Sequence, residues 1–167
     1  MRLIRAILVT LALSAAFVSA YAANDRKSEK EEIESMVKDA VNNHTLAIEV
    51  DFIVPTGMPS FNSTEGYTLR IKDGKVKAFL PYFGTGYAAM ISGVDEANFN
   101  FDDCEIKIEE DNAKAKRGKY TWRFSAENGS ENVDVTINFD KKGYAEISCD
   151  SMRKSNIRYS GKLIKVE

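Results

Sequence analysis

The chain is short of the residues that most catalytic and metal sites use. It has one histidine, His44, two cysteines and one tryptophan among 167 residues. A Ser-His-Asp or Cys-His site would need His44, and no serine or cysteine stands near it at a motif spacing. The acidic residues lack the order of a calcium-binding loop, and no phosphate-binding glycine loop is present. The sequence therefore predicts no catalytic residue, no metal site and no cofactor.

An excess of positive charge and a long apolar run are also missing. The 23 basic residues are outnumbered by 25 acidic ones, and the net charge is −2. A dedicated nucleic-acid binder would show a basic excess, so we expect no nucleic-acid partner. The one apolar run, residues 6–18, is shorter than the roughly 20 residues that cross a bilayer. We expect no stable membrane anchor once it is removed.

The N-terminal residues carry the features of a signal for export. Arg2 and Arg5 precede the apolar run, and small residues at Ala20 and Ala22 follow it at the spacing of a cleavage site. This order is typical of a secretory signal peptide, which we place at residues 1–22. The sequence then predicts a leader and amphipathic helix over 23–44 and a single antiparallel β domain over 45–167. We expect the mature protein in the periplasm or secreted.

The hydrophobic period changes once along the mature chain. Apolar residues recur at helical spacing from Ile33 to Val41, which predicts a helix over roughly 28–42. After Thr45 the period is two, with turn signals at Asp73-Gly74 and Asn128-Gly129. This predicts an all-β fold with one N-terminal helix, an antiparallel up-and-down meander of about eight strands. A lipocalin-like barrel or half-barrel would remove the sheet edges, and a two-sheet β-sandwich is the alternative.

One segment combines aromatic residues with glycine and proline. Residues 80–87 read Leu-Pro-Tyr-Phe-Gly-Thr-Gly-Tyr, directly after an expected strand. Aromatic side chains on a glycine-bent loop stack on sugar rings or apolar ligands, which predicts Tyr82, Phe83 and Tyr87 as ligand-binding residues. The alternative is that these side chains plug the end of a barrel.

Three further features carry weaker expectations. Cys104 and Cys149 lie in expected strands, where they form either a disulfide, allowed after export, or small core residues. Asp150-Ser151-Met152 resembles a short acceptor for O-glycosylation, with Ser151 as the modified residue. Four basic residues on one expected turn are typical of a solvated hairpin tip: Lys114, Lys116, Arg117 and Lys119.

Several short patches resemble one family, small secreted β-rich proteins of gut anaerobes with a domain of unknown function. The specific patch is Phe79-Leu-Pro-Tyr-Phe-Gly84, and more general ones are residues 66–71, 142–145 and 156–161. The resemblance covers about Leu46 to Val166. It implies export and a β-rich fold, and it brings no activity and no catalytic residue.

The sequence favours an exported, non-enzymatic binding protein whose ligand is a small apolar molecule, a peptide or a glycan. In the alternative, the protein is a docking or inhibitor module that contacts an envelope protein. A carboxylate-based glycan hydrolase is a further alternative, since the spacing of paired carboxylates does not appear in sequence. A large internal cavity would favour small-ligand binding, and a filled core with exposed aromatics would favour docking.

Overall fold

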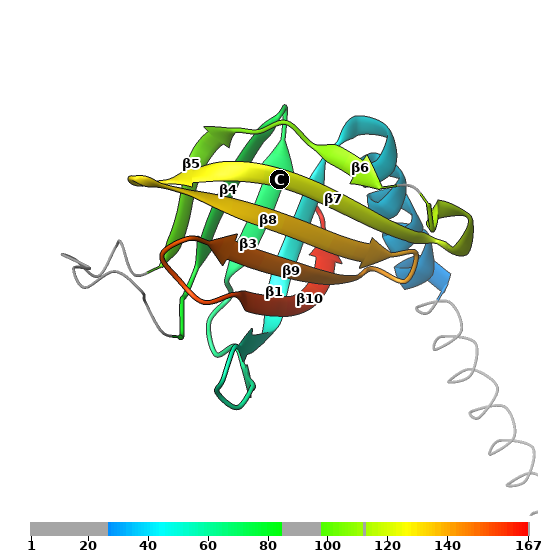
Figure 1. The fold of residues 1–167 in the computed structure, drawn as a ribbon. Coiled ribbons are helices and arrows are strands. Elements are labelled where there is room, and N and C mark those ends of the chain that lie inside the picture. Colours follow the sequence, from blue (N-terminus) through cyan, green and yellow to red (C-terminus); the bar gives the residue numbers. More distant parts are fainter. Residues whose placement is uncertain (1–26, 85–97, 112, 167) are drawn as a thin grey trace, which may run out of the picture.

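The computed structural model describes residues 27–84, 98–111 and 113–166, so the expected signal peptide lies outside the described residues. Residues 27–43 are helical, close to the expected 28–42. Within the described residues, ten strands and one short 3-10 helix follow (Figure 1): β1 (Leu46–Pro55), β2 (Phe61–Asn62), β3 (Thr68–Lys72), β4 (Lys75–Leu80), β5 (Phe99–Glu105), β6 (Glu109–Asp111), η1 (Ala115–Arg117), β7 (Lys119–Asn128), β8 (Glu131–Asp140), β9 (Tyr144–Ser151) and β10 (Ile157–Ile164).

All ten strands belong to one antiparallel sheet. Its order is β5-β4-β3-β1-β10-β9-β8-β7-β6, with β2 paired to β1 off this path. β1 lies between β3 and β10, so the first strand pairs with the last strand on one side and with β3 on the other. The sheet curls into a half-barrel (Figure 1), which confirms the predicted fold. The two-sheet sandwich is wrong because the sheet is continuous, and the strands beyond the expected eight include the very short β2 and β6.

The alternating sequence pattern decides which side chains face inward. In β8, Val133, Val135, Ile137 and Phe139 are buried while most residues between them are exposed. The turn between β3 and β4 has positive φ at both Asp73 (52°) and Gly74 (73°). This is the backbone of the hairpin turns whose twist matches the flanking strands.

The helix covers one end of the half-barrel (Figure 1). Val37 and Ala40 are buried in the core, and Ile33, Met36 and Val41 pack against it. Outside the core, Lys165 Nζ lies 3.2 Å from Glu32 Oε1 and joins the helix to the chain after β10. Within the described residues, no helix is long and apolar enough to cross a membrane.

The central pairing of β1 with β10 depends on a glycine. The register shifts between Val50 and Phe52, opposite Gly161. A Cβ atom at Gly161 would lie 1.9 Å from the carbonyl oxygen of Glu49, far inside van der Waals contact. The two backbones therefore approach as closely as they do only because position 161 has no side chain.

Candidate functional site

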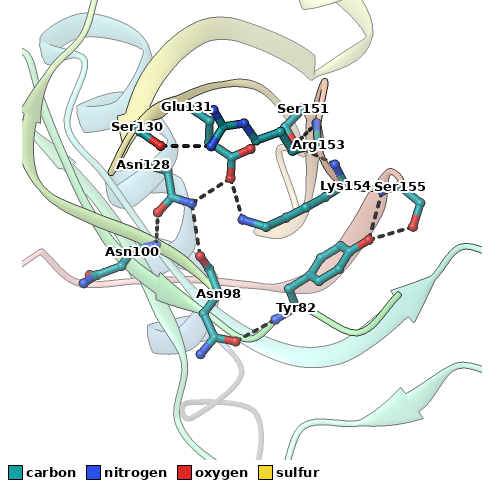
Figure 2. Close-up of polar contacts among 10 residues, drawn as sticks. All are labelled: Tyr82, Asn98, Asn100, Asn128, Ser130, Glu131, Ser151, Arg153, Lys154 and Ser155. Atoms are coloured by element: carbon teal, nitrogen blue, oxygen red, sulfur yellow. Dashed lines mark hydrogen bonds and ion pairs between the residues drawn. The ribbon is translucent and has the colours of Figure 1, made fainter. Parts of the chain in front are cut away.

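Three connections meet at the end of the half-barrel away from the helix (Figure 1). They are residues 81–84 after β4, the turn between β7 and β8, and the loop between β9 and β10. A buried polar group occupies this end, and Figure 2 shows its contacts. We call it the Lys154 cluster, defined by these residues: Tyr82, Asn98, Asn128, Glu131, Ser151, Lys154 and Ser155.

The centre of the Lys154 cluster is a buried ion pair. Lys154 Nζ lies 2.5 Å from Glu131 Oε1, and the two side chains are only 3% and 9% exposed. The ammonium also lies over two aromatic rings, 4.8 Å from the centroid of Phe99 and 5.9 Å from that of Tyr82. The two rings and the Glu131 carboxylate together enclose the ammonium of Lys154, whose side chain points inward from the loop between β9 and β10.

Asn128 extends the cluster across the gap between β7 and β5. Its Nδ2 donates to Glu131 Oε1 (3.1 Å) and to the carbonyl of Asn98 (3.1 Å), while its Oδ1 accepts from the backbone N–H of Asn100 (2.9 Å). The side-chain amide of Asn128 therefore bonds to backbone groups at the start of β5, in the way that the backbone of a neighbouring strand would. This accounts for a buried asparagine at the seam of the half-barrel.

Tyr82 ties the chain after β4 to the same cluster. Its backbone N–H donates to Asn98 Oδ1 (3.1 Å), which joins the residues just after β4 to the residue just before β5. Its hydroxyl accepts from the Ser155 N–H (2.9 Å) and lies 2.8 Å from Ser155 Oγ. A Cβ at Gly84 would lie 2.7 Å from the Tyr82 hydroxyl and from Ser155 Oγ, so a glycine is needed beside this contact.

The electrostatics of the cluster favour the ionised carboxylate. Burial acts to raise the pKa of Glu131, but hydrogen bonds from Lys154 and Asn128, the Lys154 charge and the Ser151 hydroxyl together lower it below its ordinary value. Burial raises the pKa of two neighbours, the Cys149 thiol and the Tyr159 hydroxyl, well above their ordinary values. Both stay neutral, and Tyr159 donates to the carbonyl of Pro81 (2.9 Å).

Beside the Lys154 cluster, aromatic side chains reach the surface in two pairs. Phe61 and Phe83 meet edge to face with centroids 5.0 Å apart, and Tyr67 and Phe79 lie 6.2 Å apart. Phe79 is 46% exposed and Phe83 is 38% exposed; Met58, on the turn before Phe61, is 51% exposed. We call these four aromatic residues and Met58 the aromatic rim.

The structure separates the residues that the sequence predicted as ligand-binding. Tyr82 is half-buried, packs edge to face on Phe99 with centroids 5.7 Å apart, and uses its hydroxyl within the Lys154 cluster. Phe83 reaches the surface in the aromatic rim. Tyr87 lies outside the described residues. Tyr82 therefore packs within this end of the half-barrel, while Phe83 is partly exposed at its surface.

The other candidate residues are placed as follows. Cys104 and Cys149 are both free thiols, so the candidate disulfide is not formed. Cys149 is buried in β9, and Cys104 in β5 donates weakly to the carbonyl of Glu127 (3.4 Å). Ser151 Oγ accepts from the N–H groups of Arg153 (3.3 Å) and Lys154 (3.1 Å), so the predicted glycosylation residue belongs to the cluster.

Sequence reasoning missed the ion pair. Lys154 stands in a polar stretch, Met152 to Asn156, whose composition is typical of an exposed loop. Glu131 follows an Asn-Gly turn, where a charged residue is ordinary. No local signal marks either residue as buried, because the contact joins positions 23 apart through the curvature of the sheet.

The arrangement defines a class of protein: a small antiparallel half-barrel, closed at one end by a helix and filled by aromatic side chains. Among residues 27–84, 98–111 and 113–166, no three His, Cys, Asp or Glu side chains are grouped to hold a metal ion. The chain belongs to the family described as Domain of unknown function (DUF4251), whose model matches residues 28–163. This confirms the resemblance to a family without known function.

A solved relative supports the fold. The crystal structure of a DUF4251 family protein from Bacteroides eggerthii DSM 20697 is 12% identical, with a TM-score of 0.53, over 79% of this chain and 87% of that chain. At this identity the likeness concerns the fold alone. No curated protein matches the chain.

Proposed function

We propose that this protein is an exported, non-enzymatic binding protein that docks onto an apolar surface of a partner protein through the aromatic rim. The observation that carries the proposal is the exposure of Phe79, Phe83 and Met58, at 46%, 38% and 51%, where Phe79 lies in β4, Phe83 follows β4 and Met58 follows β1. Exposed aromatic and methionine side chains that lie together are typical of protein interfaces. Export rests on the signal-like residues 1–22.

The filled interior supports docking over carriage of a small molecule. Trp122, Tyr159, Phe99 and Phe101 are at most 1% exposed and occupy the space inside the half-barrel. A ligand seated there would have to displace well-packed rings, which costs the contacts that hold the sheet in shape. Surface contact requires no such displacement.

The Lys154 cluster supports the proposal by fixing one side of the rim. Phe83 directly follows Tyr82, whose backbone and hydroxyl are both hydrogen-bonded to the cluster. Phe83 in turn packs against Phe61 from β2. A surface held in place before binding loses less conformational entropy when a partner arrives, so rigidity here increases affinity.

The enclosure of Lys154 supports a non-enzymatic role. Its side chain is 3% exposed and its ammonium is held by a carboxylate and two rings, so a substrate does not reach it. The one histidine, His44, lies at the other end, where its Nε2 is 2.6 Å from Glu110 Oε1. Of the two groups best suited to acid–base chemistry, Lys154 is therefore enclosed beside the rim, and His44 lies at the opposite end of the half-barrel.

Native mass spectrometry on protein purified from its own host tests the proposal. We expect a protein-sized extra mass that is lost on denaturation, and its absence in a Phe79→Ser/Phe83→Ser variant with an unchanged unfolding midpoint. Met152→Ser is the matched control, since Met152 is 98% exposed and outside the rim. An extra mass of small-molecule size, kept by the rim variant, would overturn the proposal in favour of ligand carriage.

A further inference from the structure

A second surface, distant from the aromatic rim, gathers unpaired positive charge. The turn before β7 carries Lys114, Lys116 and Arg117, Lys119 begins β7, and the turn between β8 and β9 adds Lys141 and Lys142. The backbone N–H of Lys141 donates to the carbonyl of Gly118 (2.9 Å), which holds the two turns side by side (Figure 1). All six basic side chains are exposed.

These six residues form no salt bridge with any described residue. That is unusual in a chain whose acidic residues outnumber its basic ones. Two carboxylates lie near them, so the basic side chains outnumber the acidic ones here. Asp140 stands opposite Lys119 and its Oδ1 accepts from the N–H groups of Lys142 (2.8 Å) and Tyr144 (3.2 Å), and the carboxylate of Glu146 lies 3.7 Å from Arg158. Lys142 also lines a small hollow with Glu29 and Glu32 of the helix, which offsets part of its charge.

A hollow of about 490 Å³ on the outer face of the sheet begins at these turns. Lys114, Lys119 and Asp140 line it where it meets these turns. Its floor is a row of outward polar side chains that stand in register on four adjacent strands. The row consists of Thr121, Asn138, Glu146 and Ser160.

The lining offers the contacts that a sugar ring uses. Tyr144 lines the hollow and is 58% exposed, which leaves its ring free for stacking. Asn138 also lines the hollow: its Oδ1 accepts from Thr121 Oγ1 (2.7 Å), and its Nδ2 donates to no described residue. Ser160 adds a hydroxyl on β10, beyond Glu146 in the same row.

We propose that this hollow binds an acidic polysaccharide. A sugar ring rests on Tyr144, its hydroxyls bond to the Asn138 amide, and its carboxylate or sulfate groups pair with Lys114 and Lys119. Charge complementarity selects the anionic polymer, and the ring with its row of amide and hydroxyl groups selects sugar over other polyanions. The site shares no residue with the aromatic rim, so it does not rest on the docking function proposed above.

Isothermal titration of the purified protein tests this proposal, with polygalacturonate and chondroitin sulfate as probes, dextran as the neutral sugar and polyphosphate as the sugar-free polyanion. We expect both acidic polysaccharides to bind and dextran and polyphosphate to bind at least about tenfold more weakly. Lys114→Gln/Lys119→Gln and Tyr144→Ala should each weaken binding about tenfold, and Tyr144→Phe should retain it.

Lys72→Gln/Lys75→Gln is the matched control, because it removes the same charge from an exposed pair on the β3–β4 hairpin. Equal loss in this control would overturn the proposal, since net charge alone would then explain binding. Polyphosphate, or vesicles of phosphatidylglycerol, binding as tightly and independently of Tyr144 would overturn the sugar assignment. Failure of both acidic polysaccharides to bind at low salt would overturn the site itself.

Discussion

Replacing Lys154 with methionine tests whether the buried ion pair holds the rim end together. The substitution keeps an unbranched apolar side chain as far as Cε but removes the ammonium, which lies 2.5 Å from Glu131 Oε1 and 4.8 Å from the centroid of the Phe99 ring. Glu131 would then be a buried carboxylate whose Oε1 keeps the hydrogen bond from Asn128 Nδ2, while its Oε2 has no hydrogen-bond partner among the described residues. Breaking a buried pair from one side costs about 3–5 kcal/mol.

That cost is a large part of the stability of a domain this size, which is about 5–15 kcal/mol. Urea unfolding followed by fluorescence of Trp122, the one tryptophan, measures it directly. Adding Glu131→Gln to Lys154→Met should recover most of the loss, because the remaining group is no longer charged. Lys162→Met, at an exposed position on β10, is the control and should change stability by less than about 0.5 kcal/mol.

The pH dependence gives a second readout of the same pair. In the native protein the pKa of Glu131 is lowered, so the stability it contributes is present above its unfolded-state pKa and is lost as the pH falls through its native pKa. In Lys154→Met, burial without the ammonium favours the neutral carboxyl, so the stability gap from wild type should narrow as the pH falls. If Lys154→Met lowered the free energy of unfolding by less than about 1 kcal/mol at pH 7, and its difference from wild type did not narrow at lower pH, an enclosed ion pair would be refuted.

Three further predictions concern single positions. Gly161→Ala should destabilise by about 3 kcal/mol or more in urea unfolding, because its Cβ would lie 1.9 Å from the Glu49 carbonyl oxygen; an effect below about 1 kcal/mol would contradict that approach. Gly84→Ala should lower affinity for the rim partner more than stability, since its Cβ would push on the neighbouring tyrosine hydroxyl 2.7 Å away; unchanged affinity would separate Gly84 from the rim. Iodoacetamide should label Cys104 in the native protein and reach Cys149, whose pKa burial raises, only after unfolding; mass spectrometry showing both labelled, or neither, would contradict the burial difference.

The sequence predicts most of the fold because its signals are local. Strict alternation decides which face of a strand such as β8 is buried, and Asp73-Gly74 supplies the positive φ that a tight hairpin turn requires. The helix is found within one residue of its expected ends. The very short strands are harder to predict from sequence. β6 consists of three acidic residues that show no apolar–polar alternation, and its strand character comes from its pairing with β7.

The candidate site is predictable only in part because its contacts are distant in sequence. Tyr82 and Phe83 are adjacent aromatic residues, and only the curvature of the sheet turns the first toward Ser155 and the second toward Phe61. Asn128 reads as a turn residue, yet its side chain closes the seam to β5. Burial of Lys154 depends on an acid 23 positions away, which no sequence period reveals.

Site-specific photocrosslinking in the host tests the central claim most directly. A benzoylphenylalanine in place of Phe83 should give one discrete protein adduct, and the same group in place of Met152, which is exposed but outside the rim, should give none. Adducts of equal yield at both positions, or no protein adduct at Phe83 when the variant folds normally, would contradict docking through the aromatic rim.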